Sequence, residues 1–426
     1  MNILVLGAAV SGVAAAHLGS RLGSEVAIYD RSSKATERLR DEGFKVHSGT
    51  WADHLLRNID LVVASPGFPE GSEPVRSALR SGIATISELE FGVRHLTVPY
   101  VAVTGTNGKT TVTHATADML TASGVPAITA GNIGTPVSGL RPAPATVVVL
   151  EASSFQLRLV DGFKPLAAGI VNVAADHLDW HPSLDAYADA KARIFERMGP
   201  DDVLAYDVDD AGAARLASRA PCRVVPVSGR LLPDDGVGIE GRALAYGDER
   251  FPLSTTDPSW AVDLGIAAVL ATVAGASGDG IAAVTRRFTP GAHRRNTVAV
   301  RDGVTWVDDS KATNPHAARA AAEAYPSVVL LAGGRNKDLD LSTLAPDTVR
   351  HVVAFGEAAD AVARSVGAPV TVVAGLEAAV RAAEAIAVPG DTVLLAPGCA
   401  SFDEFGSYAE RGERFADLVA GAGAVK

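Results

Sequence analysis

The chain is organised around residues 101–111, VAVTGTNGKTT. An apolar run at 100–103 meets a glycine-rich turn that ends in Lys109, and a helix-compatible segment follows at 112–122. A strand, a tight glycine turn and a helix start direct backbone N–H groups at one point, where the helix dipole and the lysine add positive potential. The stretch therefore predicts a phosphate-binding loop.

The spacing of this loop is shorter than in the common GxxxxGK[ST] pattern, because Val103 stands where that pattern has its first glycine. The alternative interpretation is an ordinary glycine-bearing βα turn without a ligand. Lys109 suits phosphate oxygens, and the hydroxyl of Thr110 suits Mg²⁺, so we favour the ligand. The expected contacts of the loop are Gly105, Thr106, Asn107, Gly108, Lys109, Thr110 and Thr111.

Composition limits the class of protein. A length of 426 residues suggests two to four domains, and 47% hydrophobic with 20% charged residues is typical of globular chains. A net charge of −11 argues against nucleic-acid binding and against adhesion to anionic membranes. Cys222 and Cys399 are far apart and have no metal spacing. With no signal peptide or membrane-length apolar run recognised, we expect a cytoplasmic protein without membrane insertion.

The N-terminal segment resembles the opening of a dinucleotide-type βαβ unit. It predicts a strand at 2–6, a helix at 13–22 and a strand at 25–29. Ala9 stands where the GxGxxG pattern has its second glycine, which weakens the case for NAD and for a nicotinamide-dependent oxidoreductase. A nucleotide diphosphate at the helix start and a turn without any ligand both stay open. The candidate contacts are Val10, Ser11, Asp30 and Arg31.

Three further residues of the middle region are candidates for metal chemistry. Glu151 directly follows a buried strand beside the phosphate loop, where Mg²⁺ is usually held, although a helix-start charge is the alternative. His177 follows a strand predicted at 168–173 and is either a metal ligand or a structural histidine. Lys191 lies in a helix predicted at 184–198 and by itself indicates a solvated helix lysine.

From about residue 290 onward, strands and alanine-rich helices alternate again, after a predicted hairpin at 298–307. The loops that follow the strands are polar, and such loops form the ligand edge of a parallel sheet. Lys311 and Lys337 would attract an anion there, while Thr313 and Ser401 would hydrogen-bond it. We infer a second, carboxylate-bearing substrate, with a solvated loop edge as the alternative.

Together these motifs resemble the Mur ligase family, the ATP-dependent amide-bond-forming enzymes of peptidoglycan synthesis. The resemblance covers essentially the whole chain, and its EASSFQL and SKATN signatures are similar to the D-glutamate-adding members. The ordered set is GTNGKTT at 105–111, GNIG at 131–134, EASSFQL at 151–157, DH at 176–177, Lys191, HR at 293–294, DDSKATNP at 308–315 and GGRNK at 333–337.

The resemblance implies an α/β fold in three domains. Residues 1–97 would form a Rossmann-like domain that binds the UDP substrate, and residues 98–288 a central P-loop ATPase domain with a mostly parallel sheet. Residues 289–426 would form a Rossmann-like domain that binds the amino acid. The resemblance also implies a cytoplasmic enzyme, and we expect a monomer.

The resemblance further implies an acid–amino-acid ligase that uses ATP and two Mg²⁺ ions. ATP would phosphorylate the carboxylate of UDP-N-acetylmuramoyl-L-alanine, and the amine of D-glutamate would attack the acyl phosphate. The alternatives are a Mur-type ligase for another amino acid such as L-glutamate or L-alanine, a folylpolyglutamate-synthase-like ligase, and a non-catalytic nucleotide-binding protein.

Residue roles follow from the resemblance, position by position. Lys109 would bind the β- and γ-phosphates, and Lys311 would act beside the ATP contacts Asp263, Arg294 and Asp309. The metal ligands would be Thr110, Glu151, His177 and a carbamylated Lys191. Asn132 would contact the muramoyl substrate, and Val10, Ser11, Asp30 and Arg31 would line the uridine site. D-Glutamate would be held by Thr313, Lys337, Ser401, Phe402 and Tyr408.

The chain departs from the family pattern at two places. Asp263 stands where the family has an adenine-contacting asparagine, and Arg295-Asn296 follow the HR pair where an aromatic and an acid are common. We expect both changes to alter the nucleotide side of the site.

Overall fold

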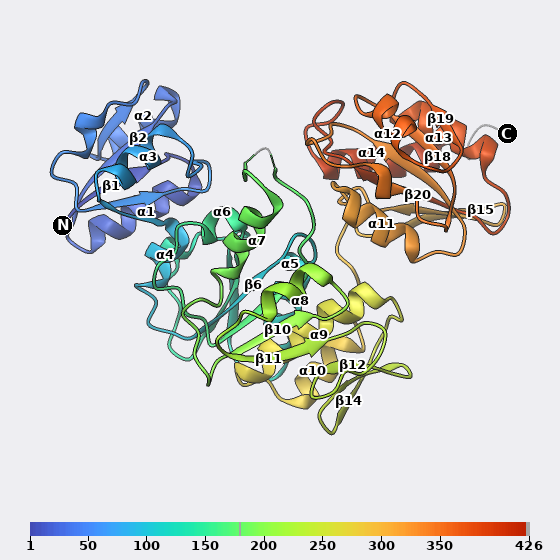
Figure 1. Cartoon of the computed structure of the whole chain (residues 1–426), viewed down its shortest axis with the longest axis horizontal. Helices are drawn as coiled ribbons and strands as arrows, with labels where there is room; N and C mark the ends of the chain where they lie inside the picture. Colours follow the sequence, from blue (N-terminus) through green and yellow to red (C-terminus); the bar gives the residue numbers. More distant parts are fainter. Residues whose placement is uncertain (179, 423–426) are drawn as a thin grey trace. The chain divides into compact units, whose positions relative to one another are not determined.

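The computed structural model describes residues 1–178 and 180–422 and confirms an α/β protein of three domains, each built on its own sheet (Figure 1). Two compact units divide the chain: one holds Met1–Val173 and Asp185–Phe288, the other Ala174–Leu184 and Thr289–Lys426. The first unit contains the first two sheets. The boundaries at 97 and 288 stay predictions.

The N-terminal sheet is parallel, with the strand order β3-β2-β1-β4-β5. Its apolar strands are buried between helices, as expected for a parallel sheet. The strands are β1 Asn2–Leu6, β2 Glu25–Asp30, β3 Lys45–Ser48, β4 Leu61–Ala64 and β5 Ala84–Ser87; the helices are α1 Val10–Arg21, α2 Ser33–Asp41, α3 Glu73–Arg80 and α4 Glu88–Val93.

The central sheet runs in the order β14-β13-β12-β11-β10-β9-β6-β8-β7, parallel except for the antiparallel steps β12-β13-β14. The strands are β6 Tyr100–Thr104, β7 Ala127–Gly131, β8 Val147–Glu151, β9 Ala167–Ile170, β10 Val203–Asp207, β11 Arg223–Val227, β12 Val237–Glu240, β13 Ala243–Tyr246 and β14 Glu249–Pro252. The helices are α5 Lys109–Ala122, α6 Ser154–Leu157, α7 Leu184–Ala192, α8 Ala211–Ala217, α9 Pro258–Val273 and α10 Gly278–Thr285.

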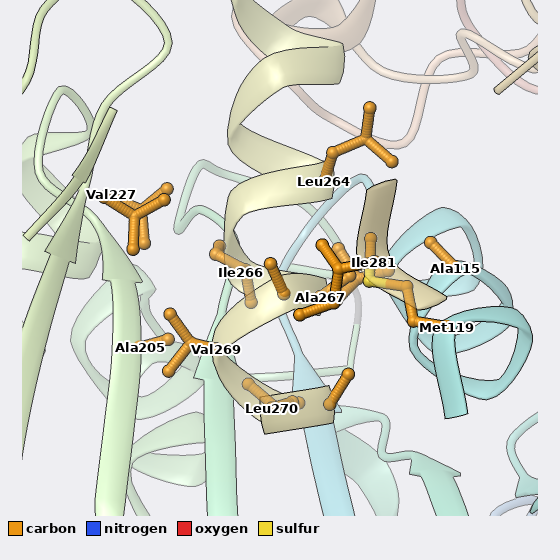
Figure 2. Packing of buried hydrophobic residues seen from close by; sticks show 14 of the residues in the cluster. Ala115, Met119, Ala205, Val227, Leu264, Ile266, Ala267, Val269, Leu270 and Ile281 are labelled. Atoms are coloured by element: carbon orange, nitrogen blue, oxygen red, sulfur yellow. The ribbon is translucent and has the colours of Figure 1, made fainter. Parts of the chain in front are cut away.

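Helix α9 is the centre of the core on one face of this sheet. Asp257 caps it by accepting from the N–H groups of Ser259 and Trp260, and its residues from Trp260 to Ala271 are all buried. Figure 2 shows α9 between strands that carry Ala205 and Val227 and the helix that carries Met119. A helix that is apolar all round needs such cover on every side.

The first two sheets share one unit because α4 joins them. The Ser138 N–H donates to Glu88 Oε1 at 2.7 Å, and the Ser87 N–H donates to the Leu159 oxygen at 2.7 Å. Gly92 leaves room for Val137, since a Cβ on Gly92 would lie 2.6 Å from Val137 Cβ.

The C-terminal sheet has the order β15-β16-β20-β17-β18-β19, parallel except for the predicted β15–β16 hairpin, which is confirmed. The strands are β15 Asn296–Arg301, β16 Val304–Asp308, β17 Val328–Gly333, β18 Val349–Phe355, β19 Val370–Val372 and β20 Thr392–Gly398; the helices are α11 Pro315–Glu323, α12 Ala359–Ser365, α13 Leu376–Ile386 and α14 Tyr408–Ala422. Among the described residues, no helix is both long and apolar enough to cross a membrane.

Several predicted element ends were wrong. Helices α1 and α5 begin at Val10 and Lys109, each three residues before the predicted start. Strand β9 ends at Ile170, because the chain beyond it bonds to the phosphate loop. Helix α7 ends at Ala192, where tighter turns begin: the Ile194 and Phe195 N–H groups donate three residues back, to Lys191 and Ala192.

Candidate functional site

The predicted phosphate loop connects β6 to α5 with the geometry that an anion site needs. Gly108 has a φ of +81° and precedes the first helical residue, Lys109, and no side chain caps the helix start. The N–H groups of the first turn point beyond the N-terminus of the helix, the direction from which phosphate oxygens would approach. Lys109 Nζ folds back over the loop and donates to the backbone oxygens of Gly105 and Thr106, both at 2.9 Å.

Asn172, just after β9, holds the loop in place. Its backbone oxygen accepts from the Thr106 N–H at 2.9 Å, and its side-chain oxygen accepts from the Asn107 N–H at 2.8 Å. Because β9 is the sheet neighbour of β6, a residue that follows β9 can hold the loop that follows β6. The sequence prediction missed Asn172, since nothing in its local pattern marks it.

Lys191 is buried beside the same loop, so its interpretation as a solvated lysine was wrong. Its side chain reaches in from α7, its Nζ donates to the Gly105 oxygen at 2.7 Å, and its residue is 1% exposed. The same ammonium group lies 4.3 Å from the centre of the Tyr187 ring, and the Tyr187 hydroxyl is 3.1 Å from Thr106 Oγ1. The loop thus contacts two lysines.

Glu151 ends β8, directly beside β6, and is 2% exposed. Its Oε1 accepts from Asn132 Nδ2 at 2.8 Å, whereas its Oε2 is buried and has no hydrogen-bond partner among the described residues. An unsatisfied buried carboxylate oxygen costs free energy unless a cation or donor joins it. The donor set next to the phosphate loop, a carboxylate with threonine hydroxyls, fits Mg²⁺.

Asp263 approaches the loop from α9. A Cβ on Gly108 would lie 2.6 Å from Asp263 Oδ1, and Asp263 is 4% exposed. A buried carboxylate therefore lies against the phosphate loop of this chain. Thr110 and Thr111 are half-buried in the first turn of α5, and Thr111 Oγ1 is buried without a partner among the described residues.

His177 belongs to the other compact unit. Its backbone N–H donates to Asp176 Oδ1 at 2.9 Å, and its φ is +54°. Asp176 in turn accepts from Lys337 Nζ at 3.2 Å and from Asn314 Nδ2 at 3.1 Å. A predicted amino-acid contact, Lys337, thus lies next to the DH pair within this unit.

The N-terminal turn after β1 is closely packed. Gly12 is required, because a Cβ there would lie 1.9 Å from the Gly7 oxygen. Asp30 braces the turn by accepting from the N–H groups of Ala8 at 2.8 Å and Ser32 at 2.9 Å. Ser11 is half-buried at the start of α1, and the predicted contacts with exposed side chains are Val10 and Arg31.

The C-terminal domain gathers its predicted residues at one sheet edge. Strands β16, β20 and β17 are parallel neighbours, so their following loops meet. These loops carry Lys311 and Thr313, Ser401 and Phe402, and Lys337. Lys311 Nζ lies 5.1 Å from the centre of the Tyr408 ring. Ser401 is buried, while Phe402 is 63% exposed.

Asp309 is a buried acid at this edge. Burial raises the pKa of Asp309 to about 7, against the opposing effect of Arg295 and Arg294. The neighbouring Asp308 lies 2.7 Å from His293 Nδ1. The HR turn and the end of β16 therefore form one charged cluster.

Family comparisons agree with this arrangement along the chain. A family model for the N-terminal domain of MurD-like Mur ligases matches residues 1–87. The Mur ligase middle domain matches residues 103–230, and the Mur ligase glutamate ligase domain matches residues 293–399.

Whole-chain relatives are similar over nearly their full length. A UDP-N-acetylmuramoylalanine–D-glutamate ligase of Frankia casuarinae is 42% identical over 98% of this chain and 94% of its own. One of Mycobacterium avium is 37% identical over 99% and 96%. Among solved structures, MurF of Acinetobacter baumannii has a TM-score of 0.61 at 16% identity, covering 93% of this chain and 90% of that one. That likeness supports the fold alone.

Proposed function

This chain belongs to the Mur ligase family, and we propose that it joins D-glutamate to UDP-N-acetylmuramoyl-L-alanine with hydrolysis of ATP to ADP and phosphate. The 42% identity to a D-glutamate ligase over 98% of the chain carries this proposal. The reaction belongs to peptidoglycan precursor synthesis. An ATP-dependent step and two free cysteines fit the cytoplasm as its location.

ATP is the phosphate donor in the proposal. Its β- and γ-phosphates would bind at the loop Gly105–Thr111, whose Thr106 and Asn107 N–H groups are already bonded to Asn172. They would also bind the ammonium group of Lys109, which now bonds to the loop itself. Asp263, Arg294 and Asp309 are the proposed further contacts of the nucleotide. The carboxyl group of Asp263 lies beside the loop. A carboxylate there would repel phosphate, and a bound cation would offset that repulsion.

The proposed metal ligands are Thr110, Glu151, His177 and a carbamylated Lys191. The unpartnered Glu151 Oε2 and the approach of Lys191 to the loop support two of these four roles. When bound, Mg²⁺ would neutralise the charge on the transferred phosphoryl group. Asn132 donates to Glu151, and it is also the proposed contact of the muramoyl substrate.

The uridine end of that substrate would meet the start of α1. We assign it to Val10, Ser11, Asp30 and Arg31. The α1 N-terminus has no side-chain cap, which supports a diphosphate there. Asp30 already holds the turn through the Ala8 N–H and its own following loop through the Ser32 N–H, so its role includes maintaining the shape of the site.

D-Glutamate would bind at the edge formed by Lys311, Thr313, Lys337, Ser401, Phe402 and Tyr408. Two lysines can meet its two carboxylates, and hydroxyl groups can orient them. The proposed sequence has two steps. A carboxylate oxygen of the first substrate attacks the γ-phosphorus and ADP leaves; the deprotonated amine then attacks the acyl carbon and phosphate leaves with the oxygen.

The chain's own residues make these steps possible by bringing anions together. Lys109 and Lys311 would offset the repulsion between the substrate carboxylate, the phosphoryl group and the amino acid. Without those cations, the repulsion between the anions would raise the activation barrier of each step.

The deciding experiment is phosphate release with ATP and UDP-N-acetylmuramoyl-L-alanine across an amino-acid panel. We expect release with D-glutamate and little with L-glutamate, L-alanine or glycine. Release with L-alanine but not D-glutamate would reject the assignment. A second arm of the experiment replaces UDP-N-acetylmuramoyl-L-alanine by a folate. We expect no phosphate release in that arm.

A further inference from the structure

Arg411, in the first turn of α14, is a completely buried arginine that the proposed site does not include. Its Nε donates to Ser310 Oγ at 2.9 Å, and its Nη2 donates to the Ser310 backbone oxygen at 2.9 Å. Nη1 and Nη2 both donate to the Cys399 backbone oxygen at 3.2 Å. One guanidinium thus makes four hydrogen bonds to two loops.

These loops carry the proposed amino-acid contacts. Ser310 directly precedes Lys311 after β16, and Cys399 lies two residues before Ser401 after β20. The third loop, after β17, passes near the guanidinium, since a Cβ added to Gly334 would lie 3.1 Å from Arg411 Nη1. That loop leads to Lys337. A rigid, planar fork is suited to fixing several loops at once.

The charge of Arg411 is stabilised by nearby carboxylates without a direct ion pair: against the larger effect of burial, Asp403, Asp308 and Glu404 raise its pKa. Among the described residues, no carboxylate lies within 4.0 Å of it, and all of its hydrogen-bond acceptors are uncharged. Burial lowers the pKa of Arg411 to about 10, which still leaves it charged at neutral pH. A buried cation is weakly screened, so its field reaches the sheet edge above it.

We propose that Arg411 is a positioning residue for the amino-acid substrate: it fixes the loops after β16 and β20 and adds positive potential where the substrate's carboxylates bind. This inference rests on the proposed function. A purely structural role would instead affect stability and all substrates alike. The two roles therefore differ in which Michaelis constant changes.

The test compares steady-state kinetics of the wild type, Arg411→Lys and Arg411→Met. We expect KM for D-glutamate to rise about tenfold in Arg411→Lys, which keeps the charge but loses the fork, and further in Arg411→Met. KM for ATP and for UDP-N-acetylmuramoyl-L-alanine should change less than twofold. Equal changes in all three constants, or unchanged KM for D-glutamate, would overturn the inference.

Two further variants complete the design. Ser310→Ala removes one acceptor of Arg411 without removing the charge, and we expect KM for D-glutamate to rise about threefold; this variant decides if the arginine variants do not fold. Arg414→Met is the matched control, because Arg414 lies one turn further along α14 and, among the described residues, pairs with Glu377 at the surface. It should match the wild type, and a D-glutamate-specific defect there would also count against the inference. Absent wild-type turnover of D-glutamate would reject the proposed function itself.

Discussion

Lys109 and Lys191 donate hydrogen bonds to the same acceptor, the backbone oxygen of Gly105, at 2.9 and 2.7 Å. The two ammonium groups come from different helices, α5 and α7. Because they share one acceptor, they are near neighbours. Like charges at short range destabilise each other, and the burial of Lys191 limits screening by water. The repulsion is relieved when an anion binds or when one lysine loses its charge.

The first prediction is that Lys191 reacts with CO₂. Its neutral amine would bond to the carbon and release one proton, so that a carbamate anion replaces the cation beside Lys109. We expect activity to fall when bicarbonate is removed and to recover when it returns. Lys191→Ala should lose at least a hundredfold in kcat and recover partly with small carboxylates. Protein equilibrated with ¹³CO₂ should show a carbamate carbon signal that is absent from Lys191→Ala.

The matched control is Lys164→Ala, because Lys164 is exposed and pairs with Asp202 at 3.3 Å, away from the loop. It should keep its activity and its response to bicarbonate. Wild-type turnover by Lys191→Ala would contradict the carbamate.

The second prediction concerns the pair between Lys337 Nζ and Asp176 Oδ1, 3.2 Å apart. Burial favours the neutral acid, but Lys337 and His177 outweigh it and lower the pKa of Asp176. A lowered carboxyl pKa gives stability that is present above the unfolded value and lost as the pH falls through the folded one. Lys337→Met should therefore destabilise the protein by about 1–3 kcal/mol at pH 7, and by less near pH 3.

Calorimetric unfolding temperatures at both pH values check this prediction. In the Asp176→Asn background the effect of Lys337→Met should shrink, because no charge is left unpaired. A gap between the wild type and Lys337→Met that is the same at both pH values would show that the ion pair contributes nothing.

Strands and motifs were predictable where the signal is local. The strand predicted at 2–6 matches β1 to the residue, because a short apolar run between turn residues permits a single assignment. The phosphate loop was predictable for the same reason. Its glycines and Lys109 are adjacent in sequence, so their geometry follows from a single turn.

Features that depend on distant partners could not be predicted from one sequence. Strand β9 ends early because Asn172 bonds to Thr106 and Asn107, residues of another strand's loop. Lys191 and Arg411 are each a cation on a helix with polar neighbours in sequence, a pattern typical of a solvated face. Only the packing of α7 and α14 buries them.

The third prediction is that Gly108→Ala disables the phosphate loop. A Cβ there would lie 2.6 Å from both Asp263 Oδ1 and Val171 Cγ1, and the φ of +81° disfavours any side chain by about 1 kcal/mol. The loop must shift to relieve the clash, so we expect KM for ATP to rise at least tenfold. Gly124→Ala is the control, since Gly124 has a similar φ of +78° and no atom within 4 Å of its Cβ position. Equal ATP kinetics for the two variants would refute the steric argument.

The fourth prediction is a pH dependence of stability that comes from Asp309. Burial raises its pKa from 3.8 to about 7, so folding takes up a proton between these values and stability falls as the pH rises through them. Asp309→Asn has no such proton. The unfolding temperature of the wild type should therefore fall relative to that of Asp309→Asn between about pH 4 and 7 and run parallel to it above about pH 8. Asp302→Asn, at the exposed hairpin turn, should show no such slope; calorimetric curves that stay parallel for Asp309→Asn as well would mean that Asp309 is ionised throughout.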